Sequence, residues 1–181
     1  MKNRRWDAIL SRLKKDEEIK VAEIGVWTGL LSKYLLKYRP LMQLYMIDRW
    51  STYTDEEKAG DESGKMTYYD QEVFDNAEKT AMSETEKYKD RRIVIKSDSA
   101  KAADQVKDNS LDLVFIDADH SYEGVKKDIQ AWLPKVKDNG WIGGHDYTRR
   151  GVEKAVSEFF NEIETDVDKT WFVRKSNTKG E

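Results

Sequence analysis

Apolar residues along the chain follow two spacings. Near the start, Trp6, Ile9, Leu10 and Leu13 recur every three or four residues, which predicts an amphipathic helix. Short apolar runs rich in β-branched residues, which are typical of buried strands, cover 19–24, 44–47, 92–96, 111–116 and 141–144. Helical spacing returns between them, over 30–38, 66–88, 99–106, 121–136 and 151–160.

Strand and helix therefore alternate along most of the chain. This pattern predicts a mostly parallel sheet with helices on both faces. Two further short runs, 163–166 and 170–174, lie close enough together to form an antiparallel hairpin. We expect a Rossmann-like, doubly wound α/β fold with a seven-stranded sheet and an antiparallel last strand.

The organisation along the chain indicates a single domain over residues 1–181. Its N-terminal helical segment covers 1–18, and a polar, acidic stretch at 49–70 reads as a lid-like insertion. The tail at 176–181 is expected to fray.

Composition narrows the class of protein. Charged residues make up 37% of the chain, yet 32 basic and 35 acidic side chains nearly cancel, which argues against a nucleic-acid partner. The absence of cysteine excludes disulfides, zinc–thiolate sites and thiol nucleophiles. No apolar run approaches the roughly 20 residues of a membrane span, and no secretory signal is visible. We expect a cytoplasmic protein without a membrane partner; a homo-oligomer is compatible with the sequence.

The turn after the first predicted strand is the most informative segment. Gly25 and Gly29 allow the backbone to adopt turn angles closed to other residues and to approach a ligand. A dinucleotide fingerprint would need glycine where Trp27 and Leu30 stand, which opposes an NAD-dependent oxidoreductase. Glu23, which opens the turn, suits a cationic ligand better than a diphosphate. The alternative is a plain tight turn between strand and helix.

Two more strand ends carry candidate ligand-binding residues. Asp48 follows the second strand, about 20 residues beyond the turn, where a carboxylate can accept both ribose hydroxyls. Arg49 and Trp50 come next, and Trp50 is expected to contact the cofactor. Asp98 and Ser99 follow the third strand and either read an adenine edge or simply cap a helix.

Both histidines of the chain fall at the ends of the fourth and fifth strands. His120 lies three residues after Asp117, and His145 directly precedes Asp146. Asp117, His145 and Asp146 converge if the strands are adjacent, and they suit Mg²⁺ or, given a histidine ligand, Mn²⁺ or another transition metal. Such a metal would lower the pKa of a substrate hydroxyl, and His120 would accept its proton. Helix and loop capping is the alternative role of these residues, and Asp119 is an alternative ligand.

These motifs resemble those of class I S-adenosylmethionine (SAM)-dependent methyltransferases over about 20–175. The segment Glu23-x-Gly25-x-Trp27-x-Gly29 resembles the acidic, glycine-rich first motif, with the middle glycine replaced by tryptophan. The closest branch includes macrocin-type sugar O-methyltransferases and cephalosporin hydroxylase-like proteins. Its signature is approached by Phe115-Ile116-Asp117-Ala118-Asp119-His120-Ser121-Tyr122-Glu123-Gly124-Val125, then Asp128, then Gly143-Gly144-His145-Asp146.

The resemblance implies methyl transfer from SAM to an oxygen of a small molecule, with metal assistance. The cofactor-binding residues would be Glu23, Gly25, Trp27, Gly29, Asp48, Arg49, Trp50, Asp98, Ser99 and Asp117. His120 and Asp117 would be catalytic, and the metal ligands would be Asp117, His145 and Asp146. A SAM-binding α/β module without catalysis is the alternative. Methylation of nucleic acid or protein is disfavoured, because the chain has no Asn-Pro-Pro-Tyr-like motif and no basic stripe.

Overall fold

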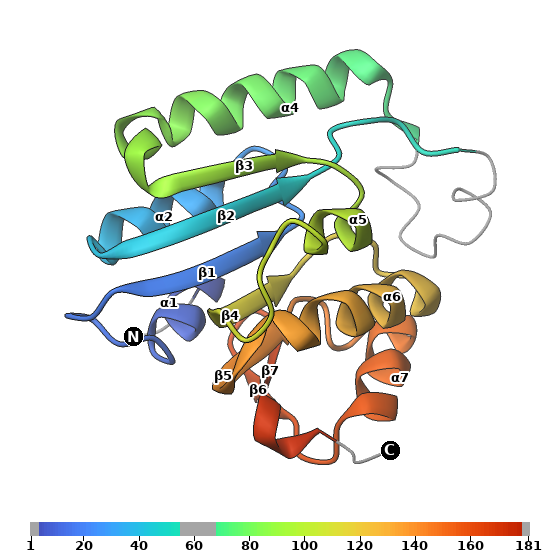
Figure 1. Ribbon diagram of the computed structural model, residues 1–181. Helices are drawn as coiled ribbons and strands as arrows, with labels where there is room; N and C mark the ends of the chain where they lie inside the picture. Colours follow the sequence, from blue (N-terminus) through green and yellow to red (C-terminus); the bar gives the residue numbers. More distant parts are fainter. Residues whose placement is uncertain (1–3, 55–67, 179–181) are drawn as a thin grey trace.

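The computed structural model describes residues 4–54 and 68–178. Within these ranges, seven strands form one sheet in the order β3-β2-β1-β4-β5-β7-β6 (Figure 1). The strands are β1 (Ile19–Ile24), β2 (Met42–Asp48), β3 (Arg92–Lys96), β4 (Leu111–Ile116), β5 (Val136–Gly144), β6 (Glu164–Asp166) and β7 (Thr170–Arg174). The first five pair in parallel, and β7 runs antiparallel to both β5 and β6. This confirms the predicted fold class.

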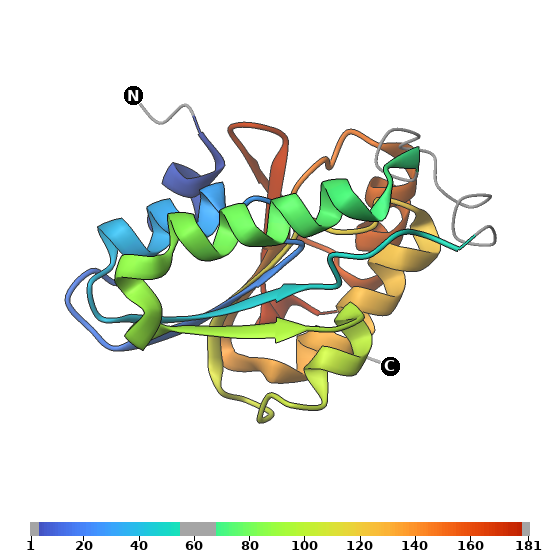
Figure 2. The same ribbon diagram turned by 90° about the horizontal axis from the view of Figure 1, so that it is seen from above.

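Helices cover both faces of the sheet (Figures 1 and 2). One face packs against α1 (Arg5–Leu10), α2 (Leu30–Tyr38) and α4 (Gln71–Glu84). The other packs against α5 (Ser99–Ala103), α6 (Tyr122–Trp132) and α7 (Arg150–Phe159). Short 3-10 helices occupy Glu86–Arg91, Leu133–Lys135 and Lys175–Asn177.

The central strand β1 shows why the chain adopts this layered form. Val21 and Ala22 are both fully buried, but successive side chains of a strand point to opposite faces. Val21 therefore belongs to the core on the α2 side, and Ala22 to the core on the α6 side. A strand buried on both faces is typical of a parallel sheet, and it explains the continuous apolar run.

The helix expected over 66–88 is shorter in the structure. α4 ends at Glu84, and Thr85 follows with its hydroxyl donating to the Ala81 carbonyl at 2.7 Å. Arg92 donates to the Met82 carbonyl at 2.6 Å. Because side chains occupy these last carbonyls, the chain leaves the α-helical path and continues as a 3-10 helix.

The expected frayed tail and lid-like insertion lie only partly within the described residues. Residues 175–177 form a 3-10 turn, and Thr178 makes a bridge to Phe160, so the described part of the tail is held against α7. Most of the predicted lid-like insertion, and positions 179–181, lie outside the described residues. In the described ranges, no helix combines the length and apolarity needed to cross a membrane.

Candidate functional site

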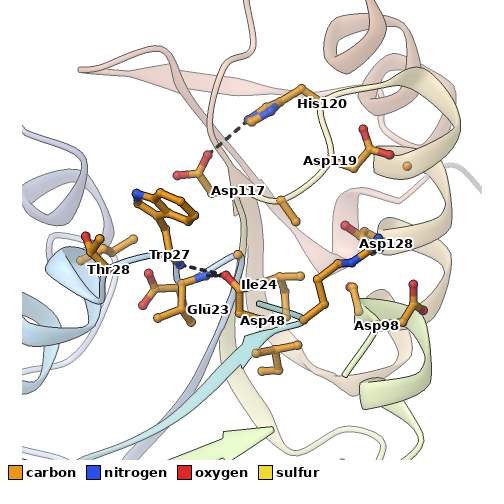
Figure 3. A pocket seen from close by; sticks show the side chains of 18 of the residues that line it. Glu23, Ile24, Trp27, Thr28, Asp48, Asp98, Asp117, Asp119, His120 and Asp128 are labelled. Atoms are coloured by element: carbon orange, nitrogen blue, oxygen red, sulfur yellow. Dashed lines mark hydrogen bonds and ion pairs between the residues drawn. The ribbon is translucent and has the colours of Figure 1, made fainter. Parts of the chain in front are cut away.

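A cavity of about 920 Å³ opens at the carboxyl ends of the central strands, where β1 lies between β2 and β4 and the strand order reverses. Figure 3 shows charged side chains from these strand ends facing this space. The predicted residues that line it are Glu23, Gly25, Trp27, Asp48, Arg49, Asp98, Ser99, Asp117 and His120. Gly29, Trp50, His145 and Asp146 are not among its lining residues.

Gly25 makes the turn after β1 possible. Its φ angle is +88°, and a Cβ atom there would lie 2.2 Å from the backbone oxygen of Asp117. Gly29 is also left-handed, with φ +74°, and a Cβ there would lie 2.9 Å from the Ala81 Cα. The turn thus fits tightly between β4 and α4, which only residues without a side chain allow.

Asp48 holds this turn in place. Its Oδ2 accepts the backbone N–H groups of Val26, at 2.9 Å, and of Trp27, at 2.8 Å. Its Oδ1 accepts the N–H of Trp50 at 2.8 Å. Burial raises the pKa of Asp48, and these backbone hydrogen bonds oppose that rise. The carboxylate therefore braces the glycine turn and also faces the cavity.

Glu23 lies at the floor of the cavity and is only 1% exposed. Burial raises its pKa to about 8, although a hydrogen bond from the Ser32 hydroxyl opposes the rise. The neighbouring charges of Asp117 and Asp48 raise it further. Glu23 is thus largely protonated near neutral pH, and a cationic ligand would favour its ionised form.

The aromatic wall of the cavity differs from the expected one. Trp50 is fully buried and packs into the core, where its Nε1 donates to the Trp27 carbonyl at 2.9 Å. Trp27, Tyr53 and Phe74 line the cavity instead, with the Trp27 and Phe74 rings in a T-shaped contact at 5.7 Å. Phe74 belongs to α4, so no local pattern around the strand ends could reveal it.

The four polar residues at the ends of β4 and β5 converge, as expected. Asp117 Oδ1 lies 3.3 Å from His120 Nε2 and 3.4 Å from His145 Nδ1. Asp146 lies 3.5 Å from His120 Nε2 through Oδ2 and 3.6 Å from His145 Nδ1 through Oδ1. Although burial opposes it, both histidines and the charge of Arg5 hold the pKa of Asp117 at about 2.

Two arginines and a further aspartate complete this cluster. Arg5, on α1, pairs with Asp117, and its Nε donates to Asp168 Oδ2 at 3.1 Å. Asp168 comes from the turn between β6 and β7, where its φ angle is +57°. Arg149 Nε donates to Asp146 Oδ2 at 2.8 Å. Sequence reasoning missed all three. Only the fold brings Arg5 and Asp168 to the ends of β4 and β5, whereas the spacing of Arg149, three residues after Asp146, could have indicated its contact.

Two carboxylates that the sequence left ambiguous take part in helix capping. Asp119 accepts the backbone N–H of Ser121 at 2.8 Å and its hydroxyl at 3.0 Å. Asp98 accepts the N–H of Lys101 at 3.4 Å as the N-cap of α5. Asp119 is therefore engaged at the start of α6, whereas Asp117 faces both histidines.

The donor set at the strand ends fits a divalent cation. One oxygen of Asp117 and one nitrogen each of His120 and His145 lie within 4.8 Å of one another. Metal–ligand distances of about 2.0–2.2 Å place neighbouring ligands roughly 3.0–3.5 Å apart, close to the separations of His145 Nδ1 from Asp117 Oδ1 and from Asp146 Oδ1. Imidazole nitrogens with carboxylates favour a transition metal over Mg²⁺.

Comparison with solved structures places the fold among methyltransferases. The O-methyltransferase NovP superposes with a TM-score of 0.69 at 17% identity, covering 93% of this chain and 74% of NovP. The calicheamicin methyltransferase CalS11 gives 0.63 at 15% identity, covering 93% and 76%. A SAM-dependent methyltransferase from Aquifex aeolicus gives 0.58 at 17% identity, covering 93% and 87%. The fold is thus that of a Rossmann-like methyltransferase.

The family is defined by sequence. A family profile described as a methyltransferase domain matches residues 22–147, and the chain belongs to this family. The matched segment runs from β1 through the end of β5 and includes the glycine turn and both histidines. An uncharacterised protein of Sinorhizobium fredii is 24% identical over 121 residues, which are 67% of this chain. The chain spans only 12% of that relative's length.

Proposed function

We propose that this domain transfers a methyl group from SAM to a hydroxyl oxygen of a small molecule, such as a sugar or natural product. The observation that carries this proposal is the acidic cavity over the glycine turn. Its acidic lining residues outnumber the basic ones, Arg4, Arg5, Arg49 and Lys127. The acidic residues are Glu23, Asp48, Asp98, Asp117, Asp119, Glu123, Asp128 and Asp168. SAM carries a sulfonium and an ammonium group, and such a lining is complementary to that positive charge.

Within this proposal, residues at different strand ends contact different parts of the cofactor. Glu23 and Gly25 border the methionine part, where the raised pKa of Glu23 would fall as the carboxylate meets the cation. Asp48 borders the ribose at the end of β2, where its carboxylate also braces the glycine turn through its backbone hydrogen bonds. Asp98 and Ser99 border the adenine.

The reaction requires one proton acceptor beside the methyl group. The carbon–sulfur bond of SAM breaks as the acceptor oxygen forms its bond to the methyl carbon, and the hydroxyl proton leaves to a base. His120 lines the cavity, and its Nε2 shares a hydrogen bond with Asp117 at 3.3 Å. Nδ1 then accepts the proton, while Asp117 stabilises the imidazolium.

A metal would assist at the same strand ends. Asp117, His145 and Asp146 would hold it, and it would lower the pKa of the acceptor hydroxyl. Arg5 and Arg149 engage the Oδ2 oxygens of Asp117 and Asp146, so a cation would bind the Oδ1 oxygens. On Asp117 this oxygen also shares the hydrogen bond with His120 Nε2, and the cation would use its second lone pair.

The acceptor class is supported by the neighbours of the fold. One structure of CalS11 is described as a TDP-rhamnose 3'-O-methyltransferase, and NovP as an O-methyltransferase. Sugar and natural-product hydroxyls are therefore the first acceptors to test.

The test is transfer of a labelled methyl group from SAM to a panel of sugar nucleotides and phenols, with and without Mn²⁺. For an acceptor that is turned over, His120→Gln should lower kcat about 100-fold or more and leave SAM binding unchanged. Glu17→Gln, at an exposed position that does not line the cavity, is the control. Equal kcat in wild type and His120→Gln would reject His120 as the base; SAM binding without transfer to any acceptor would favour the non-catalytic alternative.

A further inference from the structure

One ring nitrogen of His145 has no use in the metal site proposed above. His145 Nδ1 faces the Oδ1 oxygens of Asp117 and Asp146, at 3.4 and 3.6 Å, so this nitrogen would bind the cation. Nε2, on the other side of the ring, is buried and has no hydrogen-bond partner within the described parts of the chain. Because a buried polar atom without a partner costs free energy, an acceptor that closes on Nε2 would stabilise the site.

Asp168 presents an acceptor to this nitrogen. Its Oδ1 lies 3.6 Å from His145 Nε2. Asp168 occupies the turn between β6 and β7, where it and Lys169 both have left-handed φ angles, +57° and +54°, as a two-residue hairpin turn requires. The Lys169 carbonyl accepts the backbone N–H of Tyr147 at 3.0 Å, which ties this turn to the loop after β5. The fold therefore holds Asp168 beside His145.

Arg5 determines which oxygen of Asp168 faces the histidine. Its Nε donates to Asp168 Oδ2 at 3.1 Å, and the same guanidinium pairs with Asp117. The arginine thus engages Oδ2, and Oδ1 is directed at His145. Because N–H···O hydrogen bonds measure about 2.9 Å, a shift of roughly 0.7 Å by either side chain completes this one.

Such a hydrogen bond would decide how His145 binds a metal. An imidazole coordinates through the nitrogen that carries no hydrogen, and the partner of the other nitrogen decides which one that is. A carboxylate that accepts the Nε2–H keeps the lone pair of Nδ1 directed at Asp117 and Asp146. We propose that Asp168 is a positioning residue, which accepts this hydrogen bond and so directs His145 Nδ1 to a divalent cation. This inference rests on the metal site of the proposed function.

The test compares two variants that lose the same charge. Asp168→Gly removes the acceptor, whereas Asp168→Asn keeps an amide oxygen, and both residues suit the left-handed φ angle of this turn. Mn²⁺ is titrated into each protein and followed by electron paramagnetic resonance. We expect Asp168→Gly to bind Mn²⁺ about 10- to 100-fold more weakly than the wild type, and Asp168→Asn to bind it within a few-fold. Asp138→Asn, at a side chain 80% exposed, should bind like the wild type.

The ring nitrogens of His145 provide a second readout, which a purely electrostatic role of Asp168 would not change. Zn²⁺ serves as the diamagnetic probe, and the imidazoles are followed by ¹⁵N NMR. The chain has only two histidines, so His120→Gln assigns the signals. With Zn²⁺ bound, the wild type and Asp168→Asn should show a coordinated Nδ1 and an Nε2–H protected from exchange with water. Asp168→Gly should lose this protection.

The outcomes separate this inference from the proposed function. If Asp168→Gly binds Mn²⁺ like the wild type, or Asp168→Asn is weakened as much as Asp168→Gly, the inference fails while the metal site stands. Coordination of Zn²⁺ through His145 Nε2 also overturns it. If folded wild-type protein binds neither cation, the inference and the metal assistance fail together, whereas titration with SAM still tests the cofactor site.

Discussion

At the scale of single residues, Gly25 is a position of the glycine turn where any side chain would be strained. Gly25→Ala combines a left-handed φ with a clash against the Asp117 backbone, and we expect it to cost more than about 3 kcal/mol of unfolding free energy. Gly29→Ala meets its nearest atom at 2.9 Å rather than 2.2 Å and should cost less. Urea unfolding of the two variants measures this order, and a Gly25→Ala variant as stable as the wild type would contradict the described turn.

Glu23 gives a prediction about pH. Because its pKa is about 8 in the folded protein and ordinarily 4.5, the folded state binds a proton between these values that the unfolded state has released. The free energy of unfolding should therefore fall as pH rises from 5 to 8, by roughly 1.4 kcal/mol for each pH unit. Glu23→Gln should flatten this dependence.

Control variants separate Glu23 from other groups. Glu17→Gln, whose side chain is 59% exposed, should leave the pH profile unchanged. Asp128, with a pKa of about 7, contributes a slope of the same sign, so Asp128→Asn should flatten the profile further. A wild-type stability that rises from pH 5 to 8 would show that Glu23 is ionised in the folded protein.

The site residues that the sequence predicts are charged side chains at the ends of strands. Glu23 and Asp48 lie at the carboxyl ends of β1 and β2, and Asp117 directly follows β4, so the sequence places them at one edge of the sheet. Arg5 could not be found this way, because only the packing of α1 brings it to Asp117. Trp50 was expected at the cofactor, yet its ring lies in the core, since a local pattern does not define which side of the backbone a loop residue takes.

At the scale of elements, Arg12 ties the segment after α1 to the terminal hairpin. Its side chain, 9% exposed, donates to Asp166 at 2.9 Å and Glu164 at 3.0 Å. Its guanidinium also lies 3.7 Å from the ring centroid of Phe172. Arg12→Met should remove the hydrogen bonds to both carboxylates and lower the unfolding free energy by about 2–3 kcal/mol in urea denaturation.

A matched change at the surface provides the comparison. Lys14 is 71% exposed and pairs with Glu17 at 2.8 Å, so Lys14→Met should change stability by less than about 0.5 kcal/mol. Equal effects of the two substitutions would mean that the Arg12 contacts contribute no more than a surface ion pair.

Element boundaries followed from the sequence less well than element types. The apolar period of α4 continues beyond Glu84, but the buried hydroxyl of Thr85 and the reach of Arg92 end the helix there. β5 begins at Val136 rather than at 141. Val136 pairs with Leu111 of β4, and a register shift separates this pair from the regular pairing that begins at Trp141, so only the second half of the strand shows as an apolar run. These ends depend on partners from other parts of the chain, which periodicity does not contain.

At the scale of the whole molecule, the fold was predictable because strand and helix alternate and the final hairpin supplies the reversed strand. The strand order reverses between β1 and β4 in the parallel part of the sheet, β2-β1-β4-β5, and this reversal alone predicts a cavity at their carboxyl ends. The family profile and the solved methyltransferase structures agree with this arrangement. The proposed cofactor, acceptor and metal follow from the chemistry of the residues in and beside that cavity.

Calorimetric titration of the purified protein with SAM measures whether the cavity binds this cofactor. We predict saturable binding that Asp48→Asn weakens by about 10- to 100-fold, because the ribose and the glycine turn lose a charged acceptor. Asp108→Asn, at a side chain 69% exposed, should bind like the wild type. Absence of SAM binding by folded wild-type protein, or equal binding by Asp48→Asn, would contradict the proposed cofactor site.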